Sequence, residues 1–143
     1  MRLLFDVNTP LQLMLNCMVA RNHTECHKTL LINKQGNFDS SGLKNRLEKI
    51  GYFDRVYIID NSKGKEQAIQ MIEDIDLNQI NIYYFCNYSA FHSCYLYNKL
   101  SQEVNVKISL IEEGIATYNL YQSYDEFKKF LDLKCDLIDL DSL

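Results

Sequence analysis

Residues 106–118 read VKISLIEEGIATY, and this stretch decides the fold that the sequence predicts. Its first six residues are mostly apolar, and the run stops at Glu112, Glu113 and Gly114. Apolar residues at this density over the length of a strand indicate a parallel sheet in which the strand is covered on both faces by helices. Gly114 permits the tight turn that ends such a strand at the carboxyl edge of the sheet. Open α/β sheets hold their ligands at that edge, so the two glutamates are candidates for proton transfer.

The size and composition of the chain indicate one globular domain. It has 143 residues, 47% of them hydrophobic, with one Pro and five Gly, which argues against a disordered or linker-rich protein. The net charge is −4 and the basic residues form no stripe, so nucleic-acid binding has little support. No apolar run approaches the ~18 residues that cross a bilayer, and Leu3–Phe5 is too short for a signal peptide. We expect a cytoplasmic protein.

Cysteine and histidine offer a metal-binding alternative that the sequence does not favour. The five Cys have no repeated spacing and are expected to be reduced, small apolar fillers. In His23–Thr24–Glu25–Cys26–His27, two His and one Cys supply three candidate ligands, but no fourth is evident and the spacing fits no standard zinc pattern. A polar loop between a helix and a strand is the favoured interpretation, and no metal is expected.

Strand and helix patterns alternate five times at roughly 25-residue spacing, which predicts right-handed crossovers and a parallel sheet. The fold class is therefore α/β: a Rossmann-like three-layer domain spanning residues 1–143, with a mainly parallel sheet of five or six strands. The expected strands are Leu3–Val7, Lys28–Asn33, Arg55–Asp60, Ile80–Cys86 and 106–111, with a last short strand in Cys135–Leu143. The expected helices are Pro10–Arg21, Gly42–Ile50, Glu66–Ile75, Ala90–Leu100 and Tyr124–Leu131.

Apolar side chains at helical spacing predict which helix faces pack on the sheet. In the first helix this stripe contains Leu11, Met14, Leu15, Met18 and Val19. In the second helix it contains Leu43, Leu47 and Ile50, with Ser40 or Ser41 as the cap and Gly51 as the end.

Polar residues follow the first and fourth strands. Thr9 can cap the first helix and Pro10 suits its first position, and the free amides of that helix lie where an anionic group could dock. A capped structural helix is the alternative. Asn87, Ser89 and His92 at the end of the fourth strand are candidate cleft groups, although such side chains also cap helices.

Two segments carry a resemblance to a known family. The first is Thr9–Pro10–Leu11–Gln12–Leu13, directly after the opening strand, and the second is the acid-acid-glycine motif within Ile111–Tyr118, followed by a small residue and a Tyr. In these segments, about a tenth of the chain, the sequence resembles the bacterial sialyltransferases of glycosyltransferase family 52 and, more distantly, the capsular polysialyltransferases.

The resemblance implies an inverting transfer of sialic acid from CMP-sialic acid to an acceptor sugar hydroxyl, in capsule or lipooligosaccharide synthesis. Such enzymes have two Rossmann-like domains of the GT-B type, and this chain corresponds to the amino-terminal, acceptor-side half. The family's carboxyl-terminal domain, with its His-Pro pair, has no counterpart here, because Pro10 is the only proline. We therefore expect the chain to be inactive alone. CMP-sialic acid is the expected donor substrate, and no metal or other cofactor is expected.

The same resemblance assigns the site residues. An acid of the acid-acid-glycine motif is the family's general base, which means Glu113 or Glu112 in this chain. Since successive strand residues point to opposite faces, one of the pair reaches the cleft; Glu113 is favoured and Glu112 has a supporting role. The expected substrate-binding residues are Asn8, Thr9, Gln12, Asn87, Ser89, Gly114, Thr117 and Tyr118.

The expected partners are an acceptor oligosaccharide and the missing carboxyl-terminal domain. Without that domain, an apolar-aromatic patch around Tyr88, Phe91 or Tyr118 is expected at the carboxyl edge, favouring a homodimer. The expected location is cytoplasmic and peripheral, at the inner face of the bacterial membrane. Two alternatives stay open: a non-enzymatic α/β domain that binds a partner or regulates, and a nucleotide-sugar enzyme of another type, such as an epimerase.

Overall fold

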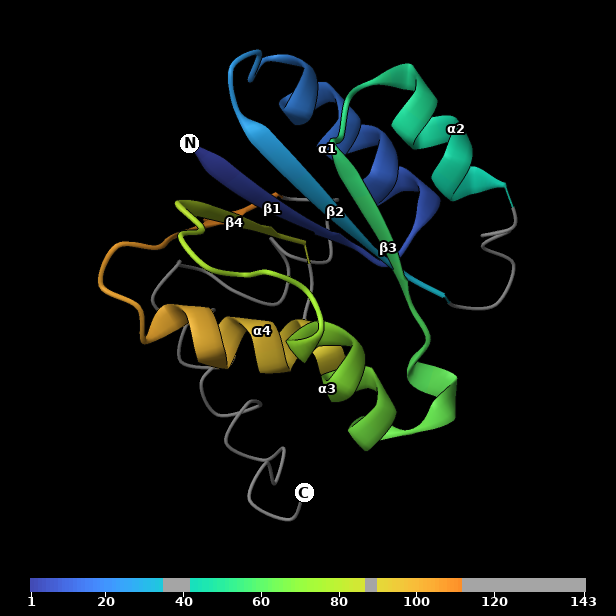
Figure 1. The fold of residues 1–143 in the computed structure, drawn as a ribbon, viewed down its shortest axis with the longest axis vertical. Helices are drawn as coiled ribbons and strands as arrows, with labels where there is room; N and C mark the ends of the chain where they lie inside the picture. Colours follow the sequence, from blue (N-terminus) through green and yellow to red (C-terminus); the bar gives the residue numbers. More distant parts are fainter. Residues whose placement is uncertain (35–41, 87–89, 112–143) are drawn as a thin grey trace, which may run out of the picture.

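The computed structural model describes residues 1–34, 42–86 and 90–111, which form an α/β domain with a five-stranded, all-parallel sheet (Figure 1). This confirms the predicted fold class. The strands are β1 (Arg2–Val7), β2 (His27–Asn33), β3 (Arg55–Ile59), β4 (Ile82–Phe85) and β5 (Lys107–Leu110). The helices are α1 (Pro10–Arg21), α2 (Leu43–Ile50), the short 3-10 helix η1 (Asn61–Lys63), α3 (Lys65–Glu73) and α4 (Phe91–Ser101). The predicted helix Tyr124–Leu131 and last strand Cys135–Leu143 lie outside the described residues.

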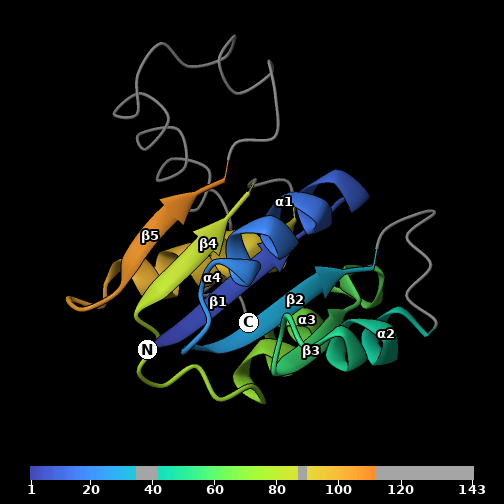
Figure 2. The same cartoon turned by 90° about the horizontal axis from the view of Figure 1, so that it is seen from above.

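The strand order is β3-β2-β1-β4-β5, so the chain adds strands on one side of β1 and then on the other. Helices α1 and α2 cover one face of the sheet, and α3 and α4 cover the opposite face (Figures 1 and 2). This is the arrangement that right-handed crossovers produce when the direction of winding reverses. The reversal lies between β1 and β4, and the crevice at the carboxyl ends of such a strand pair is where open α/β sheets bind ligands.

Strand β1 lies at the centre of the sheet and is deeply buried. Its residues from Leu3 to Val7 are all buried, and they alternate between the two faces. Phe5 stacks on Tyr84 with ring centroids 4.6 Å apart and meets the edge of Phe53 at 5.4 Å. These three rings anchor the layer beneath α1 and α2.

The predicted strand that precedes Glu112 is present as β5 and is parallel, but it lies at the edge of the sheet. Its residues are half-buried, apart from the exposed Lys107. The expectation of a strand covered on both faces is therefore wrong for β5 in the described part of the chain. Apolar density alone does not distinguish a central strand from an edge strand, because an edge strand also packs one face on the core.

The predicted packing face of α1 is wrong. The buried residues of α1 are Gln12, Asn16 and Ala20, while Leu11, Met14 and Met18 are 46%, 55% and 62% exposed. Apolar residues occur all round this helix, since Leu13, Cys17 and Val19 also pack partly against the core, so periodicity cannot select one face. The inward face carries polar contacts instead: Gln12 Oε1 accepts from the amide of Asn8 at 2.6 Å, and Asn16 Nδ2 donates to Cys86 Sγ at 3.1 Å.

Helix α2 follows the predicted pattern more closely. Leu47 is buried and Leu43 packs partly on the core, but Ile50 is 57% exposed and does not join them. The residue at the amino-terminal cap is Gly42, not Ser40 or Ser41. Gly51 ends the helix with a φ of +78°, as predicted, because a residue with a side chain is strained in that conformation.

A leucine-to-alanine substitution at each of two positions tests which leucines are buried and which are exposed. Leu31→Ala removes a fully buried side chain from the core below α3 and α4, and we expect it to lower the free energy of unfolding by about 2–5 kcal/mol. Leu11→Ala truncates an exposed side chain of α1 and should change it by no more than about 0.5 kcal/mol. Urea denaturation followed by circular dichroism measures both. A larger loss for Leu11→Ala than for Leu31→Ala would contradict the packing of α1.

Candidate functional site

Six polar side chains meet at the carboxyl edge of the sheet, on the face covered by α4. All but the half-buried Asn61 are at most 3% exposed. They come from β1 and the residue after it, from the end of β2, from η1 and from the first turn of α4. This carboxyl-edge cluster consists of Asp6, Asn8, Asn33, Asn61, His92 and Ser93.

Asp6 is the charged member of the cluster. It lies in the central strand and is 1% exposed. One carboxylate oxygen accepts a hydrogen bond from the Tyr83 hydroxyl at 3.0 Å, and the other lies 2.8 Å from Nε2 of His92. His92 lies in the first turn of α4, where the helix dipole favours a negative charge. Burial and the Asp6 carboxylate raise the pKa of Tyr83 well above its ordinary value, so Tyr83 stays a donor.

Three asparagines carry the network from His92 across the strand ends. Asn61 Nδ2 donates to Asn33 Oδ1 at 2.6 Å and to Nδ1 of His92 at 2.9 Å. Asn33 Nδ2 donates to Asn8 Oδ1 at 2.8 Å, and Asn8 Nδ2 lies 3.5 Å from Ser93 Oγ. Because Nδ1 of His92 accepts, the network assigns its proton to Nε2, which donates to Asp6. The ends of β1, β2 and β3 are thereby tied to one another and to α4.

The cluster has one acceptor left over. Oδ1 of Asn61 is buried and has no hydrogen-bond partner. A buried acceptor without a partner costs about 1–3 kcal/mol, so such an atom marks a place where a water or a ligand hydroxyl completes the structure. On the other face of the sheet, Gln12 Nε2 and Asn16 Oδ1 are likewise without partners.

The structure brings together three of the predicted substrate-binding residues, and it shows them holding the start of α1. Thr9 Oγ1 accepts from the amide of Gln12 at 3.2 Å, and Gln12 Oε1 accepts from the amide of Asn8 at 2.6 Å. This reciprocal pattern is close to a capping box. Gln12 is fully buried and Asn8 is nearly so, which leaves Thr9, half-buried, as the most accessible of the three.

The remaining predicted site residues lie outside the described residues: Glu112, Glu113, Asn87, Ser89, Gly114, Thr117 and Tyr118. The described residue next to the two acids is Ile111, whose amide donates to the carbonyl oxygen of Phe85 at 2.8 Å. This hydrogen bond continues the pairing of β5 with β4 to the carboxyl edge. Of the residues predicted to form an exposed patch, Tyr88 and Tyr118 are also outside the described part, and Phe91 is half-buried against the core.

Sequence reasoning missed Asp6, Asn33, Asn61 and Ser93 as members of a site. A signal exists for the first three, because each is a polar residue in or just after a strand near its carboxyl end, where parallel strands meet at one edge. His92 was recognised as a candidate cleft group, but its partner Asp6, 86 positions away, has no local signature.

No group of three or more metal-ligating side chains gathers anywhere in residues 1–34, 42–86 and 90–111. In the segment considered for metal binding, Nε2 of His23 lies 2.9 Å from the Tyr84 hydroxyl. No described helix combines the length and the apolar character needed to cross a bilayer.

A cavity of about 420 Å³ lies away from the cluster, at the opposite edge of the sheet, where α3 and α4 end and β5 begins. Lys99 and Glu73 in its wall form an ion pair at 2.7 Å. The side chain that would attract an anion is therefore already neutralised. The cavity lies at the opposite edge of the sheet from Ile111, the last described residue before the predicted acids.

Comparisons with protein-family models, with curated proteins and with solved structures find no match for this chain.

Paired substitutions test whether Asp6 and His92 act as a unit. His92→Leu leaves a buried carboxylate with Tyr83 alone and should lower the free energy of unfolding by at least about 3 kcal/mol; Asp6→Leu should lower it by about 1–3 kcal/mol. The double variant should lose less than the sum, with a coupling of about 1–3 kcal/mol, measured by urea denaturation. Tyr83→Phe removes the other donor to Asp6 and should lower the free energy of unfolding by about 1.5–3 kcal/mol. Strict additivity would show that the two side chains do not depend on each other.

Asp60, which precedes Asn61, provides a pH-dependent test. Hydrogen bonds from Ser62 and the nearby Lys34 ammonium, at 3.2 Å, hold the pKa of the Asp60 carboxyl below its usual range. The ionised group therefore stabilises the fold above about pH 4 and loses this effect as the pH falls through the folded-state pKa. Asp60→Asn should lower the urea midpoint at pH 7 and have little effect at pH 2. Ser62→Ala should also lower the urea midpoint at pH 7, by less than Asp60→Asn does. An equal effect of Asp60→Asn at both pH values would contradict the assignment.

Proposed function

We propose that this chain is the amino-terminal, acceptor-side domain of a sialyltransferase-like inverting glycosyltransferase. It uses CMP-sialic acid as donor and a sugar hydroxyl as acceptor, in capsule or lipooligosaccharide synthesis. On this proposal the chain supplies the acceptor site and the general base, while a nucleotide-sugar domain supplies the donor. The 143 residues contain no His-Pro pair of the kind that the donor domain of the family carries.

The observation that carries the proposal is the hydrogen bond of Ile111 to Phe85 at the carboxyl edge. Ile111 is bonded to Glu112, so the acid-acid-glycine motif follows a strand that is paired up to the edge where parallel sheets hold their ligands. The other motif, at Thr9–Leu13, begins α1 at the end of β1, on the same edge. The two segments of the resemblance thus follow strands separated only by β4.

The chemistry fits a carboxylate base. A sugar hydroxyl is a very weak acid, so a base has to take its proton as the oxygen attacks the donor, and it has to lie within hydrogen-bond reach. Glu113 is the proposed base, with Glu112 supporting it. Asn61, with a spare acceptor at the same edge, suits a neighbouring acceptor hydroxyl.

The proposal includes a location. The acceptors of this class are surface polysaccharides or lipooligosaccharides, so the enzyme works in the cytoplasm at the inner face of the bacterial membrane, as a peripheral protein. Self-association to a homodimer belongs to the same proposal.

Acceptor binding to the purified chain tests the function. We expect saturation-transfer NMR to detect binding of an acceptor oligosaccharide and not of CMP, and we expect no transfer of sialic acid from CMP-sialic acid by this chain alone. Glu113→Gln should weaken acceptor binding about tenfold, because a hydrogen bond to a charged group is lost. Glu103→Gln, at the opposite edge, is the matched control and should bind like the unmodified chain. Absence of acceptor binding would contradict the function, and transfer by the lone chain would contradict its being half an enzyme.

A further inference from the structure

Helix α1 presents apolar side chains to solvent, which is the reverse of an ordinary helix on a sheet. Leu11, Met14 and Met18 are spaced three and four residues apart and lie on one side of the helix, opposite the buried Gln12 and Asn16. On the neighbouring α2, Ile50 is also more than half exposed. We call these four exposed apolar residues, Leu11, Met14, Met18 and Ile50, the outer patch.

The same two helices carry most of the positive charge on the helices of this domain. Together α1 and α2 contain four basic residues and one acid, whereas α3 and α4 contain two basic and two acidic residues, in a chain whose net charge is −4. The acid, Glu48, is half-buried and accepts a hydrogen bond from the amide of Val56 at 3.3 Å. The basic residues, all exposed, are Arg21, Lys44, Arg46 and Lys49.

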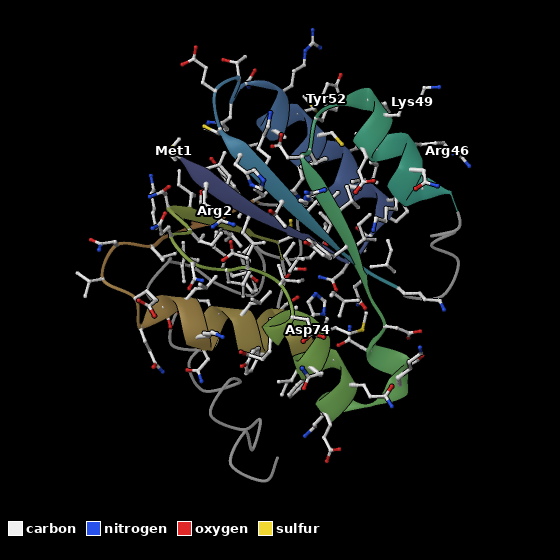
Figure 3. All side chains as sticks on the ribbon, in the orientation of Figure 1. Met1, Arg2, Arg46, Lys49, Tyr52 and Asp74 are labelled. Atoms are coloured by element: carbon white, nitrogen blue, oxygen red, sulfur yellow. The ribbon has the colours of Figure 1, made fainter. Side chains whose placement is uncertain are left out.

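The apolar and basic side chains share one face of the molecule. Helices α1 and α2 lie on the same side of the sheet (Figure 1). Arg46 and Lys49 are on the part of α2 that is turned away from the strands (Figure 3). Apart from Leu11, in the first turn of α1, the outer patch lies further along the helices from the carboxyl edge, so an occupant on it leaves the proposed acceptor site open.

We propose that the α1–α2 face docks on an anionic lipid bilayer. The outer patch enters the boundary between headgroups and acyl chains, and the four basic residues contact the anionic headgroups. Apolar side chains surrounded by Lys and Arg are the pattern by which a surface helix binds such a membrane. This inference deepens the membrane location proposed above and rests on that part of the proposed function. It does not depend on which sugar is transferred.

Charge and size favour a membrane over a protein partner. A net excess of three positive charges on α1 and α2 complements an anionic surface and opposes a second copy of the same face. The outer patch has four residues, whereas each side of a stable protein interface contributes roughly 20–30. A bilayer accommodates a few separated side chains without needing a matching contour.

The test is co-sedimentation of the purified 143-residue chain with vesicles. We expect binding to vesicles of three parts phosphatidylcholine to one part phosphatidylglycerol, little binding to pure phosphatidylcholine, and release as NaCl is raised from about 0.05 M to about 0.5 M. Arg46→Gln with Lys49→Gln should lower the partition coefficient about 25-fold, since each basic residue near an anionic surface contributes roughly fivefold. Met14→Asp with Met18→Asp should lower it at least tenfold.

Controls separate docking by this face from non-specific attraction. Val104 is 97% exposed and Lys63 is exposed, and both lie outside α1 and α2, so Val104→Asp and Lys63→Gln should leave vesicle binding unchanged. All variants change exposed residues, and circular dichroism checks that they fold. No binding by the unmodified chain, or equal losses in the control variants, would overturn the inference. The inference would also be overturned if the variant Met14→Asp with Met18→Asp lost a dimer that the unmodified chain forms but still bound vesicles. If vesicle binding fails but acceptor binding is intact, the proposed transfer function is not contradicted.

Discussion

A carboxylate in the middle of a parallel sheet needs hydrogen-bond donors, and the carboxyl edge of this domain is arranged around that need. Asp6 belongs to the central strand, where both faces are covered and water does not reach it. Tyr83 from the next strand and His92 from α4 supply the two donors. Because His92 is then fixed in its tautomer, its other nitrogen accepts from Asn61, which extends the network to the loop after β3. A buried charge thus determines how α4 and three strand ends meet.

The network ties the strand ends together, which the glycosyl-transfer site that we propose would require of its supports. Asn8 and Asn33 lock the ends of β1 and β2 together at 2.8 Å, next to the reversal of strand order where ligands bind in folds of this kind. A base that removes a proton from a sugar hydroxyl has to be held within hydrogen-bond distance, and a loop can hold it there only if its supports do not move. The cluster is best understood as this support. The acids proposed for the chemistry follow β5, the strand beside β4.

Two faces of the domain have separate roles in this account. The carboxyl edge carries the buried polar cluster, while α1 and α2 carry exposed apolar side chains and exposed basic residues. Helix α1 links the two, because the contacts of Thr9 and Gln12 that begin it at the edge also set which side of the helix faces outward. A change at the start of α1 therefore affects both the site and the exposed surface.

The sequence by itself determined the fold class, the order of strands and helices, and the end of α2 at Gly51, because these follow from local patterns of apolar residues and from the conformational freedom of glycine. The resemblance named Asn8, Thr9 and Gln12 as binding residues, and the structure shows that they lie together at one edge. Only the tertiary structure decided that β1 is central and β5 an edge strand, that α1 buries Gln12 and exposes Met14, and that Asp6 meets His92. The reason is physical: such choices depend on contacts between residues far apart in the chain, and a polar side chain is buried only where a distant partner satisfies its hydrogen bonds.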